Sequence, residues 1–295
     1  MKIKTQEISF SLLKEKEIRL FIKRIDQIHE HISGNKWFKL KYNLIEAKNQ
    51  GAQSILTFGG AYSNHIAATA FLAKENGFTS IGIIRGEEHL CLNPTLDFAI
   101  EQGMKIHYMS RSDYRLKHTV HFLEKLALQF GDFYLIPEGG TNQLAIKGAA
   151  EMLDKNDTQD FICCAVGTGG TIAGIINATN EHQEVIGFPA IKGFTQLEKN
   201  TESWVNKKNF KFINNYHCGG YAKLTNQLIE FMNNFFKTQN IPLDAIYTGK
   251  MMLGIMDLVS KDYFPKGSSI LAIHTGGLQG NKGMNQRFEC NFPTN

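Results

Sequence analysis

The chain has 295 residues, enough for one large domain or two of ordinary size, and long enough to bury a substantial core. Its 32 basic and 28 acidic side chains leave a scattered net charge of only +4, which argues against a nucleic-acid partner. The 21 Phe, 9 Tyr and 2 Trp exclude a disordered chain, and no apolar run of about 18 residues predicts a membrane span.

Short apolar runs recur along the chain, and each leads into a glycine-rich or polar turn and then into a segment with helical spacing. Runs that are almost wholly apolar, rather than alternating, are typical of parallel strands covered on both faces. In chain order, the pattern predicts strands over 54–58, 80–84, 133–136, 161–166, 245–247 and 270–273. Alternating strands and helices indicate an α/β fold. The Lys- and Asn-rich stretch 199–212 is expected to be an exposed loop.

One glycine-rich loop has the features of a phosphate site. The sequence Gly-Thr-Gly-Gly-Thr at 167–171 follows a predicted strand and precedes a helical segment. Glycines let successive backbone N–H groups point into one concavity, and the helix start adds partial positive charge. The alternative is a plain tight turn. The loop is not a Walker A motif, and it lacks the third glycine of GxGxxG because Ile172 stands there.

Lys36 stands beside Gly34 and Asn35, near the start of a predicted helix. A positive helix end and reduced solvation both disfavour an ammonium, so they would depress the pKa of this amine. A neutral amine is what Schiff-base chemistry requires. The alternative is an ordinary surface lysine.

Other candidate groups are weaker when each is taken alone. Ser63 opens another predicted helix, where it could be a simple cap or a ligand for an anion, and it lacks the glycines of a GxSxG elbow. His274 ends a predicted strand and is expected to be a structural histidine. His118 and His121 lie three residues apart without a supporting carboxylate or cysteine cluster, so no metal site is expected.

The five cysteines form no CxxC pair, and their odd number argues against a disulfide framework. No apolar stretch follows the charged N-terminus, so no signal peptide is expected. Together these features favour a reducing cytoplasm.

Taken in order, seven motifs resemble those of pyridoxal-phosphate enzymes of the tryptophan-synthase-β fold type. More narrowly, the chain is similar to the D-cysteine desulfhydrase and 1-aminocyclopropane-1-carboxylate (ACC) deaminase group. The motifs, spread between residues 33 and 277, are SGNKWFKLKYN, TFGGAYSNH, PEGGTN, VGTGGT, GGY, YTGK and HTGG. The resemblance implies two open, twisted α/β domains with the cofactor in the cleft between them, and a homodimer. The large domain would span 1–40 and 135–295, and the small domain 41–134.

The resemblance also implies which residues hold the cofactor. Lys36 matches the catalytic lysine that binds pyridoxal phosphate covalently, and Asn64 matches the residue that bonds its phenolic oxygen. Thr248 and Thr275 match positions that face the pyridine nitrogen. The phosphate would be held by Gly167, Thr168, Gly169, Gly170 and Thr171.

By the same resemblance, the substrate is a small amino acid, and Ser63 binds its carboxylate region as a catalytic residue. Tyr247 matches a catalytic tyrosine that flanks the cofactor ring. Asn64, His65 and Tyr221 complete the substrate pocket.

Two positions bear on the choice of reaction. ACC deaminases resemble one another in a Glu and a Leu where this chain has Thr248 and Thr275. A carboxylate at the pyridine nitrogen keeps the ring a strong electron sink, and a threonine hydroxyl does so far less. Opening a cyclopropane benefits from a strong sink, whereas expelling a thiolate from the β-carbon tolerates a weak one. We therefore expect β-elimination on D-cysteine or a similar small D-amino acid, giving pyruvate, sulfide and ammonia.

Other activities remain open at this point. They are ACC deamination to 2-oxobutyrate and ammonia, a dehydratase or racemase acting on serine, and a non-catalytic pyridoxal-phosphate-binding protein. Phe38 stands where many members have Arg, and Ser33 replaces the first Gly of GGNK. Both departures bear on which substrate the pocket admits.

Overall fold

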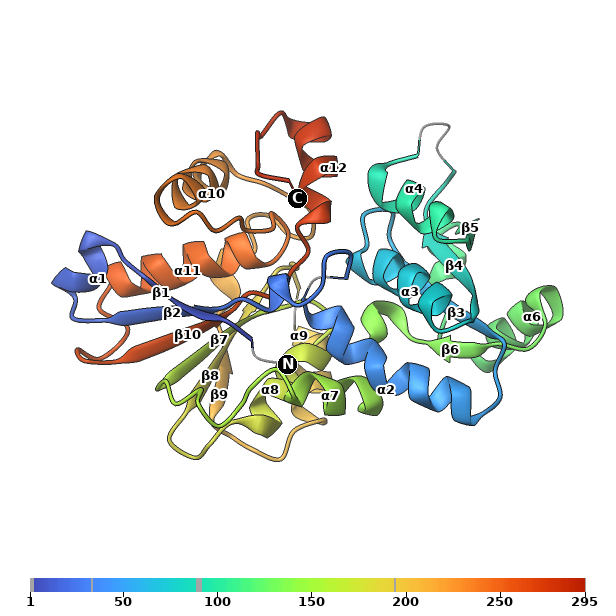
Figure 1. Cartoon of the computed structure of the whole chain (residues 1–295), viewed down its shortest axis with the longest axis horizontal. Helices are drawn as coiled ribbons and strands as arrows, with labels where there is room; N and C mark the ends of the chain where they lie inside the picture. The colour runs from blue at the N-terminus through green and yellow to red at the C-terminus, as the bar shows by residue number, and fades with distance from the viewer. Residues whose placement is uncertain (1–2, 33, 89–91, 194, 295) are drawn as a thin grey trace.

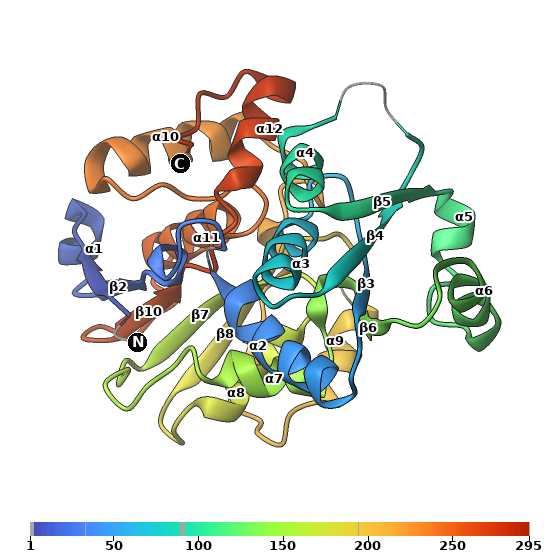
Figure 2. The ribbon, with the colours of Figure 1, turned by 45° about the vertical axis from the view of Figure 1, so that its right-hand side comes forward.

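The computed structural model describes residues 3–32, 34–88, 92–193 and 195–294, so Ser33 and Cys91 lie outside the described residues. The chain forms two sheets with helices against both faces (Figures 1 and 2). This is the predicted α/β class. Among the described residues, no helix has both the length and the apolar character needed to cross a membrane.

The larger sheet has six strands, and the smaller sheet has four. In spatial order, the larger sheet holds β1 (Thr5–Ile8), β2 (Arg19–Lys23), β10 (Ser269–Ile273), β7 (Phe161–Val166), β8 (Glu184–Pro189) and β9 (Phe210–Phe212). The smaller sheet holds β5 (Met104–Met109), β4 (Thr79–Arg85), β3 (Ser54–Gly59) and β6 (Tyr134–Ile136). Every pairing is parallel except that of β1 with β2.

Helices connect these strands in sequence. The α-helices are α1 (Ser11–Glu15), α2 (Asn35–Asn49), α3 (Asn64–Glu75), α4 (Pro94–Glu101), α5 (Arg111–Tyr114), α6 (Val120–Phe130), α7 (Gln143–Ala150), α8 (Gly170–Ala178), α9 (Thr195–Glu202), α10 (Asn226–Gln239), α11 (Thr248–Ser260) and α12 (Gln279–Phe288). Short 3-10 turns are η1 (Ile25–Gln27), η2 (Glu138–Gly140) and η3 (Asn214–Tyr216).

Burial on both faces explains the continuous apolar runs. In β7, Cys163 packs in a core with α10 and α11, while its neighbour Cys164 packs on the opposite face with α8. In the smaller sheet, Ile55 faces α2 and α3, whereas Leu56 faces α6. Each strand therefore needs apolar residues at successive positions.

Two local predictions are wrong. The stretch 199–212 is not a loop throughout, because α9 covers its start and β9 pairs with β8 at its end. Residues 245–247 form no strand, since they make the turn into α11.

The four-stranded sheet ends at β6, so the boundary expected after residue 134 falls inside a strand. A two-domain division, with α2 leading from one sheet to the other, is our proposal.

Candidate active site

A cavity of about 360 Å³ lies where the carboxyl ends of strands from both sheets meet. This volume suits a small ligand, and the position is the one expected for open α/β sheets. Of the predicted site residues, those that line it are Lys36, Ser63, Asn64, His65, Gly167, Thr168, Gly169, Thr171, Tyr221, Tyr247 and Thr275. Gly170 and Thr248 are not among the lining residues.

Lys36 is fixed by contacts of the two residues before it. Gly34 has φ +85°, and a Cβ there would lie 1.9 Å from the Thr275 carbonyl oxygen, so only glycine allows this approach. The Asn35 N–H donates to the same oxygen at 3.1 Å, and its Nδ2 donates to Thr171 Oγ1 at 2.8 Å. Burial lowers the pKa of Lys36 to about 8, which is the predicted direction.

Lys39 was not recognised from the sequence, although it lies one turn after Lys36 on the same face of α2. Its side chain is fully buried, and its Nζ donates to the Gly139 carbonyl at 2.6 Å and to Thr141 Oγ1 at 2.8 Å. Burial, and then the nearby Lys36, hold its pKa well below the usual value. This spacing of lysines was the signal that could have identified it.

The Gly-Thr-Gly-Gly-Thr loop opens α8. Gly169 has φ +86°, and a Cβ there would lie 2.3 Å from Thr201 Oγ1. A Cβ on Gly170 would lie 3.3 Å from Lys39 Nζ, so the lysine amine reaches this loop. Thr141 Oγ1 also lies 2.5 Å from Thr168 Oγ1. Gly170 therefore allows Thr141 and Lys39 to pack closely against the loop from behind the cavity wall.

This donor set fits pyridoxal phosphate. Hydroxyls, a helix N-terminus and the Lys39 amine suit a phosphate group. The Lys36 amine of depressed pKa suits the aldehyde. Gly167, Thr168, Gly169 and Thr171 on the wall would hold the phosphate, with Gly170 and the Lys39 amine directly behind them, and Lys36 would hold the aldehyde carbon.

The start of α3 supplies three further cavity residues. Ser63 is the N-cap, and its Oγ accepts from the Ile66 N–H at 3.4 Å. Asn64 Oδ1 accepts a hydrogen bond from Gln279 Nε2, which links α3 to the start of α12. Both residues thus combine a structural contact with a place on the cavity wall. His65 is almost completely buried beneath them.

Two tyrosines that line the cavity contact each other. The rings of Tyr221 and Tyr247 make an edge contact with centroids 6.3 Å apart. Burial raises the pKa of Tyr221 to about 12 and that of Tyr247 well above its usual value, so both phenols stay protonated. A buried lysine, Lys250, donates to the Gly220 carbonyl at 2.7 Å and holds the loop before Tyr221.

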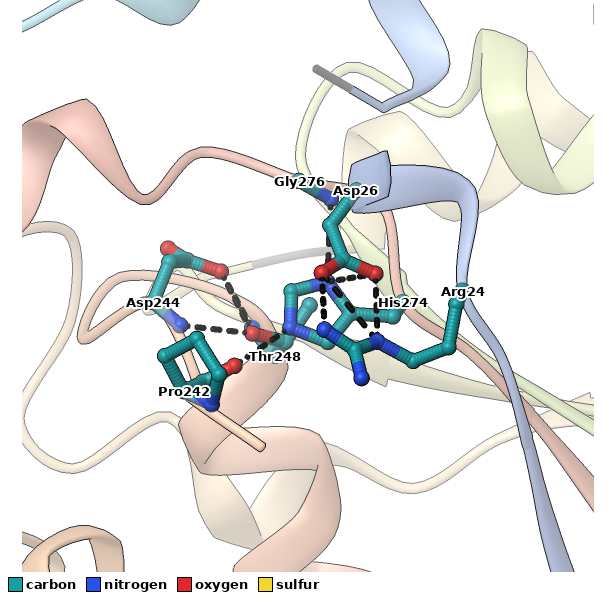
Figure 3. Close-up of polar contacts among 7 residues, drawn as sticks. All are labelled: Arg24, Asp26, Pro242, Asp244, Thr248, His274 and Gly276. Atoms are coloured by element: carbon teal, nitrogen blue, oxygen red, sulfur yellow. Dashed lines mark hydrogen bonds and ion pairs between the residues drawn. The ribbon is translucent and has the colours of Figure 1, made fainter. Parts of the chain in front are cut away.

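Thr248 is not among the residues that line the cavity. Figure 3 shows its hydroxyl beside Asp244. Its hydroxyl donates to Asp244 Oδ2 at 2.8 Å and accepts from the Asp244 N–H at 2.8 Å. The other carboxylate oxygen of Asp244 accepts from the N–H groups of Ile246 and Tyr247. These bonds from the Asp244 side chain close the turn that leads into α11, and they explain why 245–247 is not a strand. The structure thus separates the two threonines, because Thr275 does line the cavity.

A buried network supports the loop that carries Thr275 (Figure 3). His274 Nε2 donates to the Pro242 carbonyl at 2.7 Å, and its Nδ1 accepts from the Gly276 N–H at 3.2 Å. Asp26 Oδ1 lies 3.6 Å from the same ring, and Asp26 also pairs with Arg24 at 2.6 Å. His274 is therefore the structural histidine that the sequence indicated.

Two charged residues at the cavity were not predicted. Arg85, at the end of β4, is exposed, and its Nη2 lies 3.8 Å from the Cβ position of Gly60. Glu138 pairs with Lys117 at 3.3 Å. Among the described lining residues, Glu138 is the one carboxylate. Arg85 gives the side near Ser63 a positive charge.

Comparison with known proteins gives one consistent result. A family model described as "Pyridoxal-phosphate dependent enzyme" matches residues 5–276. The chain is 33% identical to the bifunctional mitochondrial D-cysteine desulfhydrase/1-aminocyclopropane-1-carboxylate deaminase of Arabidopsis thaliana, covering 88% of this chain and 73% of that protein. It is 30% identical to a putative 1-aminocyclopropane-1-carboxylate deaminase of Pyrococcus abyssi, over 90% of this chain and 87% of the relative. It is 26% identical to a D-cysteine desulfhydrase of Klebsiella pneumoniae, over 88% of this chain and 86% of the relative. A solved ACC deaminase homologue superposes with a TM-score of 0.82 at 26% identity, covering 97% and 93% of the two chains.

Proposed function

Because this chain belongs to the family of pyridoxal-phosphate-dependent enzymes, and within it to the ACC deaminase and D-cysteine desulfhydrase group, we propose that it catalyses β-elimination on D-cysteine or a similar small D-amino acid. The products would be pyruvate, sulfide and ammonia. The observation that carries this choice is the position of Thr275 on the cavity wall, where deaminases resemble one another in a leucine.

The electrostatics of the cavity support the same choice. A strong electron sink needs a carboxylate at the ring nitrogen, and the one described lining carboxylate, Glu138, is already paired with Lys117. Asp244 is not among the lining residues, and its two oxygens are taken up by the hydrogen bonds of the turn into α11. The site is therefore better suited to releasing a good leaving group than to opening a ring.

Each residue can be given a role on this proposal. Bound pyridoxal phosphate supplies the electron sink. Lys36 holds the cofactor and, once released from it, accepts the α-proton at Nζ, which its lowered pKa permits near neutral pH. Ser63 and the start of α3 bind the substrate carboxylate, with Arg85 adding positive charge near them. The protonated Tyr221 and Tyr247 flank the reacting atoms and can donate hydrogen bonds.

The deciding experiment measures the products of the purified, cofactor-loaded protein. D-cysteine, L-cysteine and ACC are supplied in parallel, and sulfide, pyruvate and 2-oxobutyrate are quantified. Sulfide and pyruvate from D-cysteine alone would support the proposal, and the variant Lys36→Ala should abolish steady-state turnover. If D-cysteine yields neither sulfide nor pyruvate, the choice of substrate is refuted.

ACC deamination is a second candidate with equal support, because the Arabidopsis relative is named for both activities and the Pyrococcus abyssi relative is named as a putative ACC deaminase. Formation of 2-oxobutyrate from ACC, with no sulfide from D-cysteine, would establish it. A protein that binds the cofactor yet yields no product with any of the three substrates would fit the non-catalytic alternative.

We also propose a homodimer in a reducing cytoplasm. Family resemblance supports the dimer, and the four described cysteines, Cys163, Cys164, Cys218 and Cys290, are all free. The molar mass measured by light scattering of the protein eluting from a size-exclusion column would test the dimer.

A further inference from the structure

The side chain of Gln279 holds the Asn64 amide in one orientation. Gln279 is the first residue of α12, and its Nε2 donates a hydrogen bond to Asn64 Oδ1. A side-chain amide has an oxygen at one end and an NH2 group at the other, so a bond to the oxygen leaves both N–H donors for other partners. The contact with Gln279 therefore determines which end of the Asn64 amide is available to a ligand.

The donor end of this amide lies beside a loop that borders the cavity. A Cβ on Gly277 would lie 2.4 Å from Asn64 Nδ2, whereas a Cβ on Gly280, in α12, would lie 3.9 Å from Oδ1. Thr275 and Gly276 of the same loop line the cavity, and so does Asn64. Among the residues that the structure describes, Asn64 Nδ2 donates no hydrogen bond. The amide therefore has both N–H donors left for a ligand in the cavity.

Close packing fixes the position from which Gln279 acts. Gly283, one turn later in α12, lies against Tyr62, since a Cβ there would be 2.6 Å from the ring. α12 also contacts α4, which connects two strands of the smaller sheet, and the two helices lie side by side in Figure 2. α12 follows β10 of the larger sheet, whereas Asn64 follows β3 of the smaller sheet. The Gln279 side chain therefore joins two parts of the chain that meet at the cavity.

We propose that Gln279 is a positioning residue, which turns the Asn64 amide so that its N–H donors face the phenolic oxygen of bound pyridoxal phosphate. The inference rests on the proposed site, in which Asn64 bonds to that oxygen, and deepens it by naming the residue that orients the amide. A donor stabilises negative charge on the phenolic oxygen, whereas a carbonyl oxygen in the same place would repel it. Gln279 is not among the residues that line the cavity, so it acts through Asn64.

The experiment reverses this hydrogen bond at nearly constant side-chain size. In Gln279→Glu, a carboxylate oxygen takes the place of Nε2, so it accepts from Asn64 Nδ2 and turns Asn64 Oδ1 toward the cavity. In Gln279→Leu, neither orientation of the amide is favoured. The readout is the visible absorbance band of the cofactor-loaded protein as a function of pH, because the proton on the cofactor-linked Lys36 nitrogen is shared with the phenolic oxygen.

A donor that stabilises the phenolic oxygen as an anion makes the shared proton easier to lose. Gln279→Glu should therefore raise the midpoint pH of the band by about 1, the effect of one hydrogen bond to a charged group, and Gln279→Leu should raise it by less. Most of the rise should disappear when Asn64 is also replaced by alanine, because Gln279 acts through Asn64.

Gln286→Glu is the matched control, because it introduces the same charge at an exposed position of α12 and should titrate like the wild type. An unchanged midpoint in Gln279→Glu would overturn the proposal. An equal rise in the presence and absence of the Asn64 side chain would overturn it as well, because the added charge would then act directly on the cofactor.

A measurement on the wild-type chain covers the case in which these variants fail to fold. Nitrogen-15 NMR should show the side-chain NH2 signal of Asn64 moving downfield when pyridoxal phosphate binds, because a proton donated to an anionic oxygen is deshielded. An Asn64 signal that does not change would overturn the proposal. Neither measurement requires a substrate, so failure of D-cysteine turnover and failure of this inference are distinguishable.

Discussion

Replacing Lys39 by methionine should weaken cofactor binding without unfolding the protein. Its buried amine reaches the loop at 167–171, so it is placed to bond to a bound phosphate. A charged hydrogen bond contributes about 1.5 to 3 kcal/mol, which corresponds to a roughly 10- to 150-fold weaker affinity for pyridoxal phosphate. The free energy of unfolding of the cofactor-free chain should change by less than about 1 kcal/mol. The lost hydrogen bonds are offset because a poorly solvated amine is no longer buried.

The assay is an absorbance titration of cofactor-free protein with pyridoxal phosphate and, separately, with pyridoxal. Only the first ligand has the phosphate, so Lys39→Met should weaken the first titration and spare the second. Lys41→Met is the matched control, because Lys41 lies on the same helix but pairs with Glu151 at the surface. An equal loss of affinity for both ligands would refute the role of Lys39 at the phosphate.

Three further predictions concern the cavity and the residues next to it. Gly169→Ala should cost more than 1 kcal/mol of stability and weaken cofactor binding, because its Cβ would clash. Gly77→Ala, with a similar φ of +79° and nothing within 4 Å, should show only the backbone strain in thermal melting. Thr248→Val should lower stability by about 1 to 3 kcal/mol with little effect on turnover, whereas Thr275→Val should alter turnover and leave melting nearly unchanged. Finally, in the cofactor-free protein, the rate of Lys36 acetylation, measured by mass spectrometry, should rise roughly tenfold per pH unit below pH 8 and level off above it. Exposed lysines should keep gaining reactivity to about pH 10, and a common profile would contradict the lowered pKa.

The parts of the site that depend on local backbone conformation could be predicted from the sequence. The glycines at 167–171 and the polar residues at 63–65 follow predicted strands, so each loop was expected at the carboxyl end of a strand. The two strands lie in different sheets, so only the folded structure shows that these loops meet at one cavity. The place of Lys36 beside a helix start is local in the same sense.

What escaped prediction depends on partners far along the chain. Thr248 follows an apolar segment that resembles a strand end, and only in the folded chain do the hydrogen bonds of the Asp244 side chain make that segment a turn into α11. Lys39 is buried because Gly139 and Thr141, about 100 residues later, supply its acceptors. The spacing of Lys36 and Lys39 places both on one face of α2, but nothing in the sequence of α2 indicates these two distant acceptors.

The packing of β7 has a chemical consequence for the two adjacent thiols. Cys163 and Cys164 are neighbours in sequence, yet the sheet stands between their side chains. Burial raises the pKa of Cys164 to about 12 and that of Cys163 well above its usual value. Only a thiolate attacks peroxides or oxidised sulfur compounds readily, so both thiols are expected to be unreactive near neutral pH. A catalyst whose proposed product is sulfide thus keeps these thiols in a form that reacts little with peroxides or with the polysulfides that form when sulfide is oxidised.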